Sequence, residues 1–329
     1  MFSSRMNISE SFRVMSQLRT QYTHIQYVEK ISQQFKSGYH LCGLKENGKV
    51  ISVAGFRFSN SLALGKHIYV EDFVTDETVR NRGYGKKLLE GIVEIGNESG
   101  VNSIVLDSGV QRFGAHQFYI KNSFDIKAYL MLRSLTTVNK PFVPENSGAS
   151  CLPIQDERSI QSSFHLMAQL RPNYSQADFL TKIKEQQSDG YELLGVIHEG
   201  QIVALAGIRF KDSLAMGKYI YIEDFITEHA HQKKGHGGHL LNAIVEKAKA
   251  AGVDKVLLDS GVQRNDAHRF YYQHAFDIRA FVFILPMPHS IQNTPHMFSK
   301  KDAFLISSHT LSSALNAENN ANNPLNSKI

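Results

Sequence analysis

Apolar positions near the start of the chain follow the spacing of helices. Phe12, Met15 and Leu18 recur at intervals of three residues, which places them on one face of a helix. A second stretch with helical spacing covers residues 25–35. The chain therefore opens with two predicted helices.

Strand-like patterns come next. Two apolar runs, over residues 39–44 and 50–58, flank Asn47-Gly48, and an Asn-Gly pair between such runs indicates a tight hairpin. A further strand over residues 66–75 stops just ahead of a glycine-containing segment, which opens an amphipathic helix marked by Leu88, Leu89, Ile92 and Val93. The remaining predicted elements are a strand at 103–106, a helix at 115–122 and a strand at 126–132.

This whole pattern occurs twice. Residues 11–135 align without a gap on residues 163–287, displaced by 152 positions, and a little under half of the residues are identical. A period of this length predicts two whole domains rather than a solenoid of short units. The predicted boundaries are an N-terminal domain at 1–137, a linker at 138–157, a C-terminal domain at 158–288 and a tail at 289–329.

The order of elements predicts an α+β (mixed α/β) fold. Each copy combines an antiparallel meander with one strand–helix–strand crossover, so each should form a mixed, mostly antiparallel sheet flanked by helices. The linker, which contains Pro141, Pro144 and Asn146-Ser147-Gly148 without sustained periodicity, should be exposed. The Asn-rich tail should be disordered, although Phe304-Leu305-Ile306 could dock locally.

Composition narrows the class of protein. The 329 residues are 42% hydrophobic and 20% charged, with a formal net charge of +5 spread along the chain; this disfavours a nucleic-acid partner. No apolar run approaches the ~20 residues of a membrane span, so a cytoplasmic protein is expected. Cys42 and Cys151 are the two cysteines, which supports neither a disulfide framework nor a thiolate metal site.

The glycine segments are the strongest local signal. Both copies fit R/Q-x-x-G-x-G between a strand and a helix. Glycines allow close approach of a ligand to the backbone, and a helix N-terminus offers N–H groups and a positive dipole end, which suits a pyrophosphate. The segments are Arg80, Asn81, Arg82, Gly83, Tyr84, Gly85 and Lys86 in copy one, and Gln232, Lys233, Lys234, Gly235, His236, Gly237 and Gly238 in copy two.

Two other nucleotide-binding loops do not fit. The third glycine of the dinucleotide-binding motif is replaced by Leu88 and Leu240, and the loop follows a meander instead of opening the fold. The G-K-[ST] ending of a Walker loop is absent as well.

With these loops, three blocks in the same order make the chain resemble the GNAT superfamily of acyl-CoA-dependent N-acetyltransferases over both copies. The blocks are Tyr-Val-Glu-Asp-Phe-Val-Thr at 69–75 and Tyr-Ile-Glu-Asp-Phe-Ile-Thr at 221–227, the glycine loops, and Ala-His-Gln-Phe-Tyr at 115–119 and Ala-His-Arg-Phe-Tyr at 267–271. The resemblance implies acetyl-CoA as co-substrate, with its pyrophosphate at the loops. It also implies that the preceding strand ends line the pantetheine, through Phe73, Val74, Thr75, Phe225, Ile226 and Thr227.

The resemblance also implies catalytic residues. Tyr119 and Tyr271 stand where such enzymes often keep a tyrosine that returns a proton to the departing thiolate; the alternative is a pair of core aromatics. Glu71 and Glu223 match an acidic strand residue that holds and helps deprotonate an acceptor amine.

Neighbouring residues offer further contacts to an acceptor. Asp72 and Asp224 are candidates for substrate binding, but successive strand residues face opposite sides unless a β-bulge intervenes, as the family implies here. Arg57 and Arg209 could clamp an acceptor carboxylate or could be solvated strand arginines.

No metal is expected. Four histidines in copy two lie near one another in sequence, but copy one has other residue types at all four positions. They are His229, His231, His236 and His239.

The sequence therefore predicts a tandem N-acetyltransferase that moves acetyl from acetyl-CoA directly to a primary amine, at up to two active sites. The alternatives are an acyl-CoA-binding scaffold with one or both domains non-catalytic, and a transferase that uses aminoacyl-tRNA. The glycine loops and the weak basic signal argue against the second of these. The acceptor and the oligomeric state stay open, and the two domains could form an internal pseudo-dimer.

Overall fold

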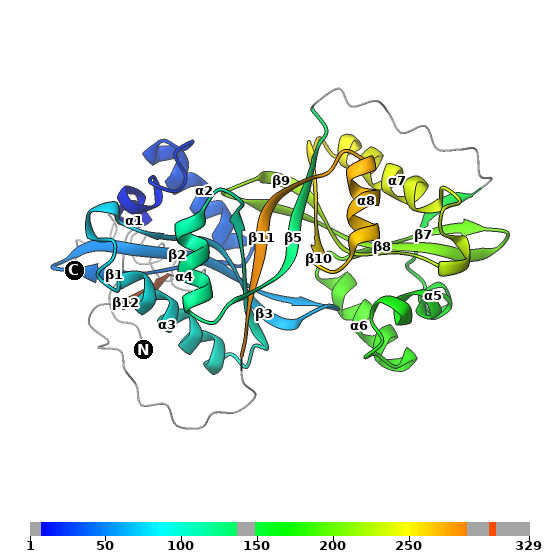
Figure 1. Cartoon of the computed structure of the whole chain (residues 1–329), viewed down its shortest axis with the longest axis horizontal. Helices are drawn as coiled ribbons and strands as arrows, with labels where there is room; N and C mark the ends of the chain where they lie inside the picture. The colour runs from blue at the N-terminus through cyan, green and yellow to red at the C-terminus, as the bar shows by residue number, and fades with distance from the viewer. Residues whose placement is uncertain (1–7, 137–148, 288–302, 307–329) are drawn as a thin grey trace, which may run out of the picture. The chain divides into compact units, whose positions relative to one another are not determined.

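The computed structural model describes residues 8–136 and 149–287, together with the backbone of 303–306 (Figure 1). These residues form two compact units. The first contains residues 8–59, 66–106, 285–287 and 303–306, and the second contains 60–65, 107–136 and 149–284. Both units therefore draw on chain from both copies of the repeat.

The first unit has two helices, a sheet and a third helix that follows the glycine loop. Its strands lie in the order β12-β1-β2-β3-β4, with β3 and β4 parallel. Its elements are α1 (Ile8–Met15), α2 (His24–Lys36), β1 (Tyr39–Glu46), β2 (Lys49–Ser61), β3 (Gly65–Thr75), η1 (Glu77–Val79), α3 (Tyr84–Glu98), β4 (Ser103–Gly109) and β12 (Ala303–Ile306).

The second unit repeats this plan and adds strands. Its order is β11-β5-β10-β9-β8-β7-β6, and β9 and β10 are parallel. Its elements are α4 (Phe113–Lys121), β5 (Asp125–Ser134), β6 (Ser150–Pro153), α5 (Glu157–Leu170), α6 (Gln176–Ser188), β7 (Glu192–His198), β8 (Gln201–Ser213), β9 (Gly217–Thr227), η2 (His229–His231), α7 (His236–Ala250), β10 (Lys255–Gly261), α8 (Asn265–Gln273) and β11 (Asp277–Pro286).

One strand of the second unit comes from the other copy. β5 belongs to copy one by sequence, yet it pairs antiparallel with both β10 and β11 of copy two. Met131 lies opposite Leu258 and is fully buried in the core of this unit. A strand buried between two others completes the hydrogen bonding of both neighbours, so copy one supplies an inner part of the second unit.

Helices cover both faces of this sheet (Figure 1). On the α7 face, Ile220 and Ile222 of β9 pack with Leu240 and Leu241 of α7. On the α5–α6 face, Phe179 of α6 packs in a separate cluster. We call the two sides of the sheet that these clusters cover the α7 face and the α5–α6 face. Side chains of β9 point to both of them.

Most predicted elements are confirmed, and so is the mixed α/β class. One segment differs from expectation: Ser150–Pro153, assigned to the linker, pairs with β7. Residues 303–306 pair with β1, Leu305 lying opposite Cys42, which agrees with the local docking allowed for this segment. The rest of the predicted tail and most of the predicted linker lie outside the described residues. Within the described ranges, no helix is both long and apolar enough to span a bilayer.

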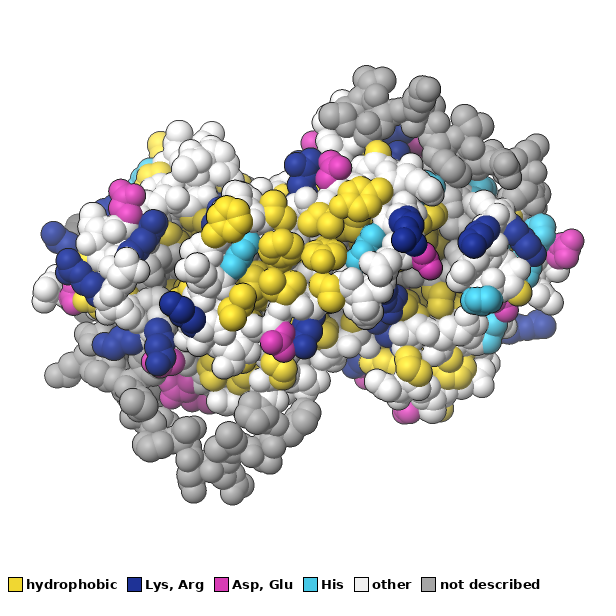
Figure 2. Space-filling view, viewed as in Figure 1, with side chains coloured by type: hydrophobic (Ala, Val, Ile, Leu, Met, Phe, Trp, Pro, Cys, Tyr) yellow, Lys and Arg dark blue, Asp and Glu magenta, His cyan; other side chains and the backbone are white. Residues whose placement is uncertain are grey.

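Exposed hydrophobic side chains gather on the side of the second unit that carries α4 and α8 (Figure 2). Phe113 and Ile120 of α4 and Tyr272 of α8 are 73%, 56% and 50% exposed. The same helices bury His116, Tyr119, His268 and Tyr271. His116, for example, lies 5.3 Å from Phe281 of β11 between ring centroids.

A glycine in β8 lets a tyrosine lie against the sheet. Tyr191, fully enclosed on the α5–α6 face, places its hydroxyl so close to Gly207 that a Cβ there would be 1.7 Å away. Gly55 stands in the same relation to Tyr39, with 1.6 Å. Both glycines belong to the Ala-Gly-x-Arg-Phe segments. The glycine of this motif is needed because a tyrosine side chain packs directly against the backbone there.

We predict that Gly207→Ala destabilises the protein by about 3 kcal/mol, because the methyl group must displace a buried ring and break its hydroxyl hydrogen bond. Urea unfolding followed by circular dichroism measures this. The matched control is Gly114→Ala in α4, where a Cβ meets nothing within 4 Å and alanine should be neutral or slightly stabilising. Equal effects of the two substitutions would contradict the packing argument.

Candidate active site

A β-bulge in β9 shapes the candidate site. Gly207 of β8 lies opposite Asp224 while the next residue, Ile208, lies opposite Ile222, so Glu223 is the extra residue. Ile222 packs on the α7 face, whereas both Glu223 and Asp224 bond to groups on the α5–α6 side. The bulge expected from the resemblance is therefore present in this strand.

Asp224 is a buried anchor of this face. It is 2% exposed; Oδ1 accepts from Arg171 Nε at 2.9 Å and Oδ2 from the Tyr191 hydroxyl at 2.8 Å. The first unit repeats the arrangement, with Asp72 bonded to Arg19 and Tyr39 at 2.6 Å each. Both oxygens of Asp72 and Asp224 are thus engaged by the protein itself, which favours a structural role over the expected contact with an acceptor.

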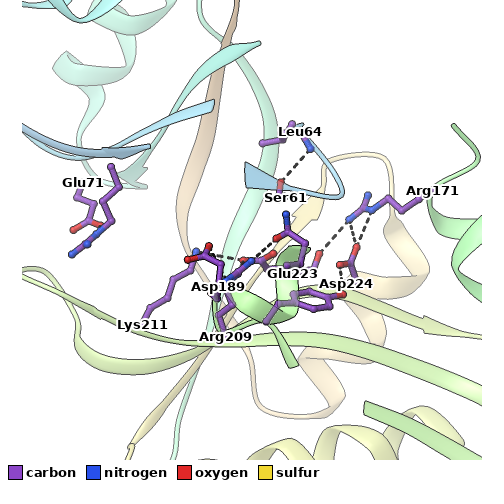
Figure 3. A network of polar contacts seen from close by, with 12 residues as sticks. Ser61, Leu64, Glu71, Arg171, Asp189, Arg209, Lys211, Glu223 and Asp224 are labelled. Atoms are coloured by element: carbon purple, nitrogen blue, oxygen red, sulfur yellow. Dashed lines mark hydrogen bonds and ion pairs between the residues drawn. The ribbon is translucent and has the colours of Figure 1, made fainter. Parts of the chain in front are cut away.

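Glu223 is held by only one of its oxygens. Oε1 accepts from Arg209 Nε at 2.9 Å and lies 3.7 Å from Lys211 Nζ. Oε2 is buried and has no hydrogen-bond partner among the described residues. Burial raises the pKa of Glu223, while Lys211 and Arg209 lower it. Figure 3 shows Arg209, Lys211 and Asp189 gathered around this carboxylate.

Arg209 is committed to internal contacts. It is 8% exposed, and its guanidinium also donates to Gln186 and to Asp189. In the first unit Arg57 bonds Glu71 at 2.6 Å. These arginines are therefore not solvated, and their donors orient the glutamates.

The two parallel strands of the second unit separate at this point. Pairing of β9 with β10 covers Ile220–Ile222 opposite Val256–Leu258, and the next residues are Glu223 and Asp259. The Tyr221 hydroxyl hydrogen-bonds Asp259. Burial, which is the largest cause, raises the pKa of Asp259 to about 7. Two carboxylates thus flank the opening between the strands.

The glycine loop lies at the N-terminus of α7. Gly235 caps the helix with φ 83°, in the left-handed region, and makes no side-chain cap. A Cβ on Gly237 would lie 3.1 Å from Thr227 Oγ1 and 3.4 Å from the Phe270 ring, so the second glycine permits close packing of the helix on β9. Lys233 is exposed beside the loop. Uncapped N–H groups with an adjacent cation fit a pyrophosphate.

Other loop residues lie as follows. Gln232 donates to the Thr227 carbonyl at 3.3 Å, and Arg80 donates to Thr75 at 3.2 Å, so each closes its loop onto the strand end. The exposed residues of the two loops are Arg80, Asn81, Arg82, Gly83, Lys86, Gln232, Lys233 and Lys234. Gly85, Gly237 and Gly238 lie in the first turn of the two helices.

The residue between the two glycines points away from the expected phosphate site. His236 is 2% exposed and its ring lies 4.8 Å from His198 and 5.7 Å from His231. In the first unit the Tyr84 hydroxyl instead donates to Glu46. Among the described residues, no group of three or more His, Cys, Asp or Glu side chains is arranged to hold a metal.

Tyr271 lies on the α7 face, opposite Glu223. It is 6% exposed and packs on Phe225, Phe270 and Phe276, with ring centroids 6.1, 5.4 and 5.6 Å away. Burial raises its pKa, so the phenol stays protonated at neutral pH. The predicted residues of copy two therefore all lie in the second unit, on both sides of one strand.

The predicted residues of copy one divide between the units. Tyr119 is in the second unit, 6% exposed and 5.3 Å from Phe283 between ring centroids. Glu71, Val74, Thr75 and the loop with Gly83 are in the first unit. Phe73 also lies there, in β3.

Sequence reasoning missed several members of the site. Asp259, Tyr221 and Lys211 were not assigned to it, nor were Arg171 and Tyr191. Leu-Asp-Ser-Gly occurs inside a strand in both copies, and a carboxylate inside a strand was a usable signal for Asp259. Lys211 gave none, because copy one has Ser59 at that position.

A mixed sheet whose parallel strands separate beside a glycine-rich helix N-terminus, with carboxylates on one side and a buried tyrosine on the other, is the arrangement that the resemblance implies. Residues 8–124 and 159–276 each match the acetyltransferase (GNAT) family. The chain belongs to this family and carries it in tandem.

Similar proteins agree with this. The uncharacterized N-acetyltransferase YhdJ of Bacillus subtilis is 36% identical over 132 residues, which are 39% of this chain and 92% of that protein. Two solved structures share the fold. A GCN5-related N-acetyltransferase from Sphaerobacter thermophilus has TM-score 0.56 and 14% identity, covering 87% of this chain and 93% of its own. A tandem GNAT protein from the clavulanic acid biosynthesis pathway has TM-score 0.52 and 14% identity, covering 76% and 85%.

The histidine pair beside the loop predicts acid sensitivity. Burial lowers the pKa of His236, with His198 and His231 acting in the same direction. The unfolded chain therefore binds the proton more readily than the folded chain. This lowers stability progressively as pH falls from about 6.5 through the lower pKa of His236 in the folded state.

The double variant His198→Glu/His236→Tyr installs the pair found in copy one. We expect the difference in free energy of unfolding between about pH 7.5 and about pH 5 to become smaller, as measured by urea titration. It should not vanish, since burial also lowers the pKa of His274. An unchanged difference would show that the pair does not contribute.

Proposed function

We propose that the second unit transfers an acetyl group from acetyl-CoA directly to a primary amine. The observation that carries this is the separation of β9 from β10 between Glu223 and Asp259, next to the uncapped N-terminus of α7. Donor and acceptor can then reach one point from opposite faces of the sheet.

The α7 face suits the donor. Gly235, Gly237 and the exposed Lys233 and Lys234 would hold the pyrophosphate through backbone N–H groups and charge. Phe225 and Thr227 follow the separation of the strands on this face and would line the pantetheine. Ile226, which was expected to do the same, packs on the α5–α6 face instead. The thioester would then lie at the opening between β9 and β10.

The α5–α6 face suits a cationic acceptor. Glu223 Oε2 is a buried carboxylate oxygen without a partner among the described residues, and an ammonium group supplies both charge and donors. The amine must lose a proton before it attacks the thioester carbonyl, and a carboxylate beside it has that purpose. Glu223 therefore holds the acceptor and helps to deprotonate it.

Tyr271 serves the other half of the reaction. Its phenol stays protonated at neutral pH and lies on the face that carries the donor, next to Phe225. It can return a proton to the departing thiolate. Glu71 in the first unit and Tyr119 in the second unit stand at the matching positions of copy one, and each is proposed for the corresponding role by its position in the sequence.

The test measures thiol release from acetyl-CoA over a panel of amino acids, polyamines, aminoglycosides and lysine peptides. Tyr271→Phe and Tyr119→Phe are made separately and together. Loss of a general acid should lower kcat by about 100-fold or more at the affected site, while calorimetry should show unchanged coenzyme A binding.

Each result has a distinct meaning. A loss in only one variant would show that the copies are unequal. Binding of acetyl-CoA without turnover on any amine would favour the alternative of an acyl-CoA-binding scaffold. Failure to bind acetyl-CoA would overturn the proposal.

A further inference from the structure

Asp259 faces Glu223 across the opening between the strands. The last paired residues are Ile222 and Leu258, and each carboxylate follows directly on its own strand. Leu258 packs on the α7 face, so its neighbour Asp259 faces the α5–α6 side, as Glu223 does.

The surroundings of Asp259 leave one oxygen available. Oδ1 is buried with no hydrogen-bond partner among the described residues, while the residue as a whole is only half-buried. The Tyr221 hydroxyl donates to this carboxylate. The other charged groups that act on it are Lys211 of β8, Glu223 of β9 and Asp107, which belongs to the second unit. Leu130 of β5 lies opposite it on the other side.

We propose that Asp259 is the proton acceptor for the acceptor ammonium group at the second unit's site, while Glu223 mainly holds that group. This rests on the proposed amine transfer. An N–H bond of the ammonium breaks, an O–H bond forms on Asp259 Oδ1, and the neutral amine keeps the electron pair that attacks the thioester. The proton later leaves Asp259 to water, because the residue is half-exposed.

The division of labour follows from the partners of each carboxylate. Glu223 Oε1 lies between Arg209 and Lys211, and these two cations act against the burial that raises the pKa of Glu223. Asp259 has a neutral hydroxyl as its hydrogen-bond donor, and burial raises its pKa to about 7. A base whose pKa lies near neutral pH combines the deprotonated form with good proton affinity.

Two neighbouring charges act on the pKa of Asp259 in opposite directions. Lys211 lowers the pKa of Asp259 and Asp107 raises it. Lys211→Met should therefore raise this pKa, and Asp107→Asn should lower it. Asp107 belongs to copy one by sequence, so one copy tunes a base of the other.

The first test needs neither acetyl-CoA nor an amine. Carbon-13 NMR of aspartate-labelled protein should show one carboxyl resonance that titrates near pH 7 and that disappears in Asp259→Asn. The pKa of this resonance should rise in Lys211→Met and fall in Asp107→Asn. Asp266→Asn is the matched control, since that side chain is 98% exposed. A resonance that persists in Asp259→Asn, or that ignores both neighbours, overturns the assignment.

The second test uses turnover in the Tyr119→Phe background, which isolates the site of copy two. The rate should rise with pH through about 7, and Asp259→Asn should lower it by roughly 100-fold and remove this limb. Lys211→Met and Asp107→Asn should move the limb in the directions given above. An unchanged profile in Asp259→Asn with intact turnover would overturn the role of Asp259 and leave the proposed function standing; absence of turnover in the parent protein would instead contradict the proposed function.

Discussion

A buried carboxylate in the middle of β9 organises the candidate site. Asp224 binds Arg171 at the end of α5 and Tyr191 just before β7, and so ties a helix and two strands together. Removing one partner from a buried pair of this kind typically costs about 3–5 kcal/mol. Because Tyr191 can reach Asp224 only over Gly207, the anchor also dictates a glycine in β8.

The β-bulge next to Asp224 turns a second carboxylate toward the same face of the sheet. Glu223 is the extra residue, and it turns toward the same face as Asp224, where Arg209 and Lys211 meet it. The same strand keeps Phe225 on the α7 face, against Tyr271. One strand thus presents a carboxylate to one face of the sheet and contacts the tyrosine on the other face.

The position of β5 shows that the two copies of the repeat do not form two separate sheets of their own strands. A strand of copy one lies between β10 and β11 of copy two, and its Leu130 sits beside Asp259. Asp107, also from copy one, acts on the charge of Asp259. The two copies therefore share a core and an electrostatic environment in the second unit, in addition to being similar in sequence.

The sequence by itself determined the elements, the mixed fold, the tandem GNAT membership and the positions of the glycine loops. These depend on local periodicity, turn residues and short motifs, all of which are written in neighbouring residues. It could not show that Arg209 is used internally or that His236 turns away from its loop, because those outcomes depend on residues distant in sequence.

Only the tertiary structure decided which strand lies beside which. β5 and β11 are copies with nearly the same pattern, so either satisfies the hydrogen bonds and the apolar face offered by β10, and no local signal distinguishes them. The same holds for Asp259, whose chemistry comes from burial and from Tyr221, Lys211 and Asp107. Pairing and burial are properties of the assembled chain, and for that reason the repeat alone could not supply them.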